Sequence, residues 1–149
     1  MSIIYYVFKG VKMFYFAYGS NLNQTQMTKR CPGSRPLYFA ELEDMKFVIN
    51  ARGVATVVPE KGGNVKGIIW EISKSNETAL DLYEGVSQNL YKKEVMSCVS
   101  NGRAVDALVY VANEQKLGAP RANYLETILD GIEEFSDDKD WFKEVASWG

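Results

Sequence analysis

Histidine is absent from this 149-residue sequence, and cysteine occurs only twice. The lack of histidine removes the commonest zinc ligand, the Ser/His and Cys/His catalytic arrangements, and the usual general base near neutral pH. Cys31 and Cys98 lie far apart and form no CxxC pair, which favours two buried thiols in a reducing compartment over a disulfide framework. Any acid–base chemistry must therefore fall to a carboxylate, a tyrosine or a lysine.

Long apolar runs and an excess of positive charge are also missing. The uninterrupted apolar run from Ile3 to Phe8 is far shorter than the ~20 residues of a membrane-spanning helix, and no secretory signal pattern is evident. The net charge is -2, and lysine and arginine are scattered along the chain instead of forming a basic stripe. We therefore expect a cytoplasmic protein that binds neither membranes nor nucleic acid.

The composition suits one globular domain. Hydrophobic residues make up 46% of the chain and charged residues 24%, so a chain of this length can bury a core without disulfides or metals. Met13 directly precedes the strand that carries the main motif. We therefore predict a single domain over residues 1–149, in which residues 1–12 are a possible N-terminal extension.

The first half of the sequence is dominated by strand patterns. An aromatic-rich strand is predicted over Met13 to Tyr18, followed by a short helix that Asn21 or Asn23 caps. From Leu37 to Val58 the pattern is again typical of strands, with a break near residues 50–53. The proline and glycines of residues 59–64 predict a turn that leads into another strand.

The second half begins with a helix that is predicted to end at Glu84, where Gly85 is the stop signal. Asn101 and Gly102 favour a tight type I′ turn between strands over residues 90–99 and 104–112. Apolar residues at three- and four-residue spacings then predict two helices, over residues 124–135 and 138–148. This order indicates an α+β fold: a mixed, mostly antiparallel sheet, curled into a small β-barrel with flanking α-helices.

The segment Tyr15 to Leu22 combines a hydrophobic strand with a Gly-Ser-Asn turn at the start of a helix. Such a turn can point successive backbone N–H groups into one concavity, which suits a carboxylate or a developing oxyanion. The alternative is a plain turn in which Ser20 and Asn21 only cap the helix. The spacing alone does not decide between these interpretations.

Glu84 lies between apolar residues at a predicted helix end, in the sequence Leu-Tyr-Glu-Gly-Val. A carboxylate that loses solvation there has a raised pKa, which suits a general acid and base. The alternative is a solvated glutamate beside a capping glycine.

Together the two segments resemble the γ-glutamylcyclotransferase (AIG2-like) family. The sequence YFAYGSNL is similar to the signature of that family, and Glu84-Gly85-Val86 followed by Tyr91 is similar to its catalytic glutamate segment. The resemblance runs from Met13 to about Tyr124, although the strands between the two motifs match only in pattern.

The resemblance implies a small barrel enzyme without a cofactor that releases 5-oxoproline from small-molecule γ-glutamyl compounds. It implies that Glu84 is the catalytic acid and base. It also implies a substrate-binding set, which consists of the loop residues Tyr18, Gly19, Ser20 and Asn21 together with Tyr91 and Tyr124 on the pocket wall. No protein nucleophile is required, because the α-amine of the substrate attacks its own γ-carbonyl.

Three alternatives remain open at the sequence level. A relative that cyclises γ-glutamylamines would use the same loop and the same glutamate. A glutathione-specific branch of the superfamily typically has leucine where this chain has Asn21, which makes glutathione a less favoured substrate. A non-catalytic binding module could keep the barrel and pocket without turnover. A structural or interaction protein is a further alternative, and it rests only on the aromatic residues Trp141, Phe142 and Trp148. These residues are expected instead to pack a terminal helix onto the barrel or to bury part of a homodimer contact.

Overall fold

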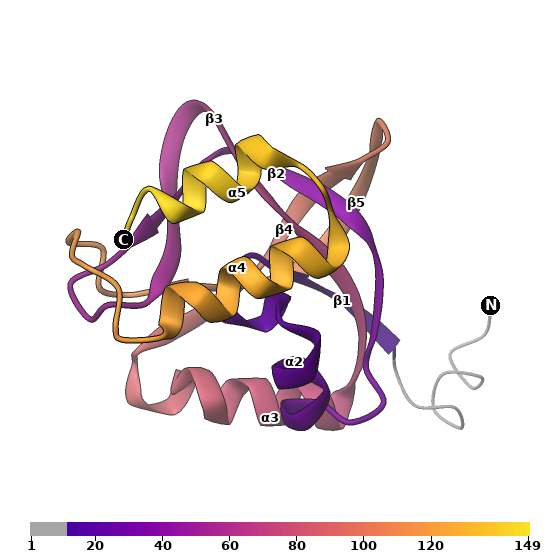
Figure 1. Cartoon of the computed structure of the whole chain (residues 1–149). Coiled ribbons are helices and arrows are strands. Elements are labelled where there is room, and N and C mark those ends of the chain that lie inside the picture. The colour runs from indigo at the N-terminus through magenta and orange to yellow at the C-terminus, as the bar shows by residue number, and fades with distance from the viewer. Residues whose placement is uncertain (1–11) are drawn as a thin grey trace.

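Five strands close into a barrel in the computed structural model, which describes residues 12–149 (Figure 1). The predicted extension over residues 1–12 lies outside the described residues except for Lys12. The strands are β1 (Lys12–Ala17), β2 (Arg35–Ile49), β3 (Ala55–Ser73), β4 (Tyr91–Ser100) and β5 (Arg103–Ala112). Their order around the barrel is β1-β3-β2-β4-β5, and only the β1–β5 pair is parallel. The predicted α+β barrel is therefore confirmed.

Four α-helices flank the barrel in the described part of the chain, with two short 3-10 helices between elements. They are α2 (Gln24–Arg30), α3 (Lys74–Glu84), α4 (Tyr124–Phe135) and α5 (Lys139–Ala146), with the 3-10 helices η1 (Ser20–Leu22) and η2 (Val86–Gln88). In Figure 1, α4 and α5 lie across one side of the barrel, and α2 and α3 lie together at its lower end. No helix within residues 12–149 is both long and apolar enough to span a bilayer.

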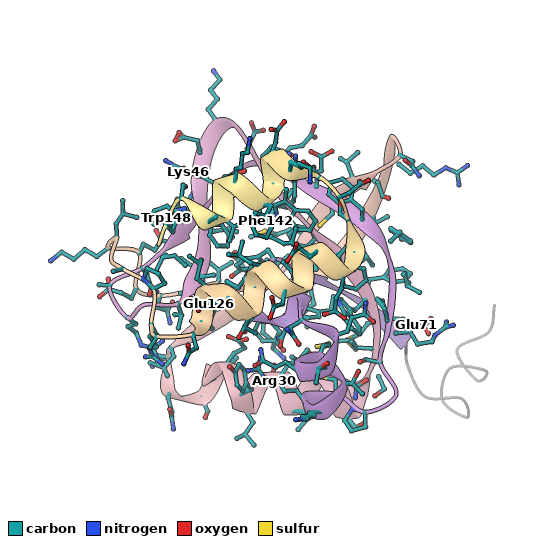
Figure 2. The ribbon with its side chains drawn as sticks, viewed as in Figure 1. Arg30, Lys46, Glu71, Glu126, Phe142 and Trp148 are labelled. Carbon is teal, nitrogen blue, oxygen red and sulfur yellow. The ribbon has the colours of Figure 1, made fainter. Side chains whose placement is uncertain are left out.

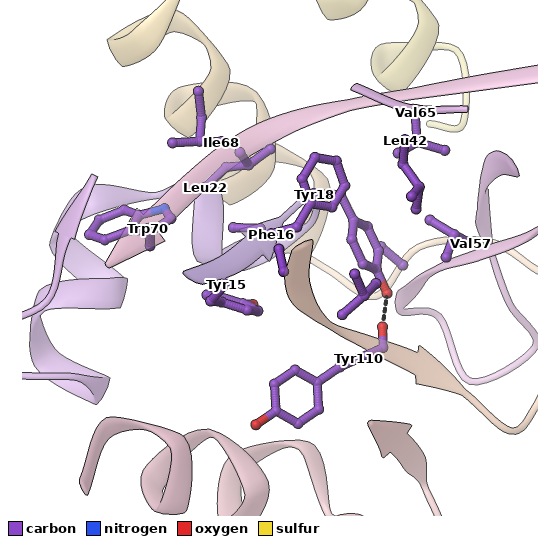
Figure 3. Packing of buried hydrophobic residues seen from close by; sticks show 14 of the residues in the cluster. Tyr15, Phe16, Tyr18, Leu22, Leu42, Val57, Val65, Ile68, Trp70 and Tyr110 are labelled. Carbon is purple, nitrogen blue, oxygen red and sulfur yellow. Dashed lines mark hydrogen bonds between the residues drawn. The ribbon is translucent and has the colours of Figure 1, made fainter. Parts of the chain in front are cut away.

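Large side chains fill the barrel and fasten the C-terminal helices to it. Phe16 and Trp70 are almost fully buried, and Figure 3 shows the aromatic and aliphatic residues that surround them. Trp70 contacts Phe135 of α4 edge-on, with ring centroids 6.2 Å apart. Trp141 of α5 is 2% exposed and contacts Phe39 in the same way at 5.7 Å. The predicted packing of the aromatic tail onto the barrel is thus confirmed.

The boundaries of α3 are set by local signals that the sequence displays. Ser73 caps its first turn by accepting a hydrogen bond from the Asn76 backbone, and the Asn76 side chain accepts one from the Ser73 backbone in return. Gly85 ends the helix in the left-handed conformation, with φ 66°. A side chain at Gly85 would also collide with Leu90, at 2.8 Å. Glu84 is consequently fixed at the C-terminal end of α3, as predicted.

The predicted turn at residues 59–64 is wrong, because β3 continues through this segment. Met45 pairs with Pro59 and Glu43 pairs with Asn64, so the residues between them bulge out opposite Asp44. The Gly62 backbone donates a hydrogen bond to the Asp44 carboxylate at 2.9 Å, which closes the bulge. Proline and glycine therefore mark an irregularity within one long strand.

Two other local predictions are confirmed. Asn101 and Gly102 join β4 to β5 with positive φ values of 49° and 75°, as a type I′ turn requires. Cys31 and Cys98 are both buried and unpaired, which agrees with structural thiols.

Candidate active site

One cavity of about 230 Å³ gathers every residue that the sequence predicted for the site. These residues come from four parts of the chain: the end of β1 with η1, the end of α3, the start of β4 and the start of α4. They are Tyr18, Gly19, Ser20, Asn21, Glu84, Tyr91 and Tyr124. Segments distant in the sequence thus converge because the barrel closes.

Close backbone packing holds the loop that follows β1. Gly131 of α4 lies so near the loop that an added Cβ would come within 2.5 Å of the Leu22 carbonyl carbon. Gly19 lies against the hairpin between β2 and β3, where a Cβ would lie 3.2 Å from that of Ala55. The Gly19 carbonyl accepts a hydrogen bond from Leu22 at 2.9 Å, which closes the single turn of η1. Glycines at these two positions therefore let α4 and the β2–β3 hairpin press onto the loop from two directions.

Arg30, the last residue of α2, supports the same loop from beneath. Its guanidinium donates hydrogen bonds to the Asn21 side-chain oxygen and, at 3.3 Å, to the Ser20 hydroxyl. It also stacks on the ring of Tyr83, 3.3 Å from the centroid. Figure 2 shows Arg30 at the place where α2 and α3 meet. The Asn21 amide in turn donates to the Tyr15 hydroxyl at 2.9 Å. The orientation of the Asn21 side chain is thereby fixed from both ends.

Tyrosines tied to the backbone form much of the pocket wall. The Tyr18 hydroxyl donates to the Tyr110 carbonyl at 2.6 Å (Figure 3), and the Tyr91 hydroxyl donates to the Ala55 carbonyl at 2.7 Å. The Tyr124 hydroxyl accepts a hydrogen bond from the Ala55 amide at 2.9 Å. Burial raises the pKa of Tyr124 to about 12 and that of Tyr91 well above its ordinary value. These phenols are therefore neutral at physiological pH and serve as rigid walls.

Glu84 is the one acidic residue among those that line the cavity. No hydrogen bond or ion pair from residues 12–149 engages its carboxylate. Burial raises its pKa to about 7, against the opposing effect of the positive charges of Arg30 and Arg52. Both protonation states are accordingly populated near neutral pH, which is the condition for general acid–base chemistry.

Several lining residues escaped the sequence analysis, notably Arg52, Arg121, Tyr15 and Tyr110. Arg52 sits in the turn between β2 and β3, and an arginine in a turn carries no signal of the pocket it faces. Arg121 lies three positions before Tyr124, so a segment already assigned to the wall could have drawn attention to it. Tyr15 and Tyr110 read only as buried strand residues.

The fold and the pocket together define a class of protein: a small barrel in which one titratable carboxyl faces a Gly-Ser-Asn loop. Residues 15–131 match the family described as γ-glutamyl cyclotransferase, AIG2-like. The chain belongs to this family.

Relatives of known sequence and structure agree with this assignment. A human γ-glutamylcyclotransferase is 30% identical over 131 residues, which cover 80% of this chain and 70% of the human protein. A bovine γ-glutamylcyclotransferase is 29% identical over 136 residues, which cover 84% and 72% of the two chains. A solved structure of a γ-glutamyl cyclotransferase superposes with a TM-score of 0.87 at 25% identity, covering 93% of this chain and 89% of the other. The resemblance found in the two motifs thus extends through the whole barrel.

Proposed function

We propose that this protein is a γ-glutamylcyclotransferase that closes the γ-glutamyl group of a small molecule into 5-oxoproline and releases an amine or amino acid. The observation that carries the proposal is the convergence of the Tyr18–Asn21 loop and the Glu84 carboxyl on one cavity. Membership of the family supports the same activity.

The reaction is an intramolecular aminolysis, so the chain needs no nucleophile of its own. The α-amine of the substrate attacks its γ-carbonyl carbon and forms the ring C–N bond, after which the original amide C–N bond breaks. A pocket that holds the folded conformer of the substrate lowers the barrier by positioning, an effect worth up to ~7–11 kcal/mol at its limit.

Glu84 transfers the first of the two protons that pass from the α-nitrogen to the leaving nitrogen. As a carboxylate it accepts a proton from the α-ammonium group, which frees the amine for attack, and as a carboxylic acid it returns that proton to the leaving nitrogen. The ring nitrogen then gives up a second proton as the lactam forms, and the released amine takes up this proton to become an ammonium group, so Glu84 ends each turnover in its starting state. A pKa of about 7 suits both steps near neutral pH.

The loop supplies charge stabilisation while Glu84 transfers the proton. Gly19 and Ser20 line the cavity, and their backbone N–H groups would stabilise the oxyanion that develops on the γ-carbonyl oxygen. The Asn21 side chain, held by Arg30, borders the same space. Tyr18, Tyr91 and Tyr124 shape the pocket around the γ-glutamyl group.

The decisive test measures 5-oxoproline release from γ-glutamyl amino acids, γ-glutamylamines and glutathione, by the wild type and by Glu84→Gln. This substitution keeps the shape of the side chain and removes the titratable group. Turnover by the wild type, lost in a folded Glu84→Gln, is expected. Binding of γ-glutamyl compounds without 5-oxoproline from any of them would instead identify a non-catalytic binding module.

The proposal also covers the domain organisation, the cellular compartment and the oligomeric state of the protein. We propose that the whole chain forms one domain, because all the described helices pack on a single barrel. The buried free thiols of Cys31 and Cys98 support a reducing compartment such as the cytoplasm. A homodimer remains a prediction that sedimentation of the purified protein would test.

A further inference from the structure

Two arginines line the cavity without a carboxylate partner among the described residues. Arg52 comes from the turn between β2 and β3, and Arg121 from the segment that leads into α4. The Arg121 Nε donates to the Arg52 carbonyl at 2.7 Å, and the Arg121 backbone donates to the Gly53 carbonyl at 3.0 Å. A Cβ at Gly53 would lie 2.7 Å from the Arg121 side chain, so the glycine permits this close contact. The two arginines are thus held together as one unit.

Among the residues that line the pocket, only Glu84 carries a negative charge to oppose the positive charges of Arg52 and Arg121. Arg52 lines the same cavity as Glu84 and Tyr91, and its positive charge lowers the pKa of both against the larger effect of burial. Arg30, the other nearby cation, is already occupied by the side chains of Ser20 and Asn21. The pocket is consequently rich in positive charge, although the chain as a whole carries a net charge of -2.

We propose that Arg52 and Arg121 form a subsite that binds a carboxylate on the leaving group. The inference rests on the proposed function and specifies which γ-glutamyl compounds the site selects. The α-carboxylate of the γ-glutamyl group is common to all candidate substrates, whereas only some leaving groups carry a second carboxylate. Guanidinium groups bind carboxylates through paired hydrogen bonds that an uncharged or cationic amine cannot form. Amino acids and peptides therefore leave from this site in preference to simple amines.

A matched pair of substrates isolates that second carboxylate. The pair consists of γ-glutamyl-alanine and γ-glutamyl-alaninamide, which differ only in a carboxylate replaced by a carboxamide. We expect the wild type to favour the acid by about ten-fold or more in kcat/KM, because hydrogen bonds between charged groups are stronger than neutral ones. The difference should lie mainly in KM and shrink at high salt.

The variants locate the preference in the two arginines. In the double variant Arg52→Gln/Arg121→Gln, the acid-to-amide ratio of kcat/KM is expected to fall toward one. Arg103→Gln removes an exposed arginine that does not line the cavity and should keep the wild-type ratio. Because both substrates are measured on the same preparation, the ratio cancels any change in folded fraction or in the pKa of Glu84.

Two results would overturn the subsite while leaving the cyclotransferase activity intact. One is equal kcat/KM for the acid and the amide in the wild type, and the other is a preference that survives in the double variant. Absence of 5-oxoproline from both compounds and from the wider panel would contradict the proposed function itself, and the subsite with it.

Discussion

Two glutamates on α3 show how differently the same side chain behaves at the two ends of one helix. Glu77 lies in the first turn and is 8% exposed, with Lys74 and Lys93 bonded to its two carboxylate oxygens at 2.9 and 2.8 Å. Glu84 is the last residue and has no such partner. The hydrogen bonds from the lysines lower the pKa of Glu77, whereas burial raises that of Glu84 to about 7.

The partners of a carboxylate, and not its burial alone, thus decide its protonation state. Both side chains are largely shielded from water, but the ammonium groups of Lys74 and Lys93 stabilise the charged form of Glu77. The helix dipole adds to the difference, since it favours negative charge at the first turn and disfavours it at the last. Glu77 is therefore held as a charged ion-pair partner, whereas Glu84 has the raised pKa that the proposed proton transfer requires.

The largest expected difference between the two glutamates is in the effect of their substitution on kcat. Glu84→Gln should lower kcat for 5-oxoproline release by roughly 10²–10⁴-fold, the range typical of a general acid–base group. Glu77→Gln should leave kcat within a few-fold of the wild type, because Glu77 does not line the cavity. Steady-state assays on γ-glutamyl-alanine would measure both. Comparable losses in two well-folded variants would refute the division of roles.

The free energy of unfolding should respond in the reverse order, so that substitution of Glu77 has the larger effect. Glu77→Gln is expected to lower the free energy of unfolding by about 1–2 kcal/mol, because it removes two charge-assisted hydrogen bonds from a withdrawn position. Lys93 keeps its second partner, Asp81, at 2.9 Å, which limits the loss. Urea denaturation would measure the change, with the exposed Glu126→Gln as the matched control. A loss no larger than that of the control would show that the ion pairs contribute nothing.

The raised pKa of Glu84 should also make the free energy of unfolding depend on pH. The folded-state pKa of Glu84 is raised to about 7 from an ordinary value of 4.5, so the folded protein binds more protons than the unfolded chain between these values. The wild type should therefore lose stability relative to Glu84→Gln as the pH rises from 5 to 8, by an amount on the order of 1 kcal/mol. The absence of histidine leaves this window nearly free of other titrating side chains. Identical pH dependence in the two proteins would contradict the raised pKa.

The sequence alone predicted the parts of the site that depend on local chemistry. Gly85 stopped α3 where expected, which placed Glu84 at a helix end, and the turn after Tyr18 formed the loop. The hairpin at Asn101 followed from the preference of that dipeptide for positive φ. Each of these features is set by a few neighbouring residues, so a single sequence contains the information.

Features that depend on contacts across the barrel were not predictable in this way. Arg52 and Arg121 are far apart in the chain, and only the closed fold brings them to one pocket. The segment from Pro59 to Asn64 has the composition of a turn, but its pairing with β2 carries the strand through it as a bulge. Local propensity correctly predicted an irregularity in this segment but wrongly predicted that the strand ends there, because pairing with β2 overrides the turn preference.

The smallest effect concerns Arg30, which acts on Glu84 only through its charge. Its positive charge lowers the pKa of Glu84, so Arg30→Met should raise that pKa and move the acidic limb of the kcat/KM profile to higher pH. Arg30→Lys keeps the charge but loses the planar fork that holds Asn21, so its limb should stay near that of the wild type while kcat falls. Lys93→Met changes the surroundings of Glu77 and should leave the limb in place. An unshifted limb in Arg30→Met would mean that the charge of Arg30 does not contribute to the proton affinity of Glu84.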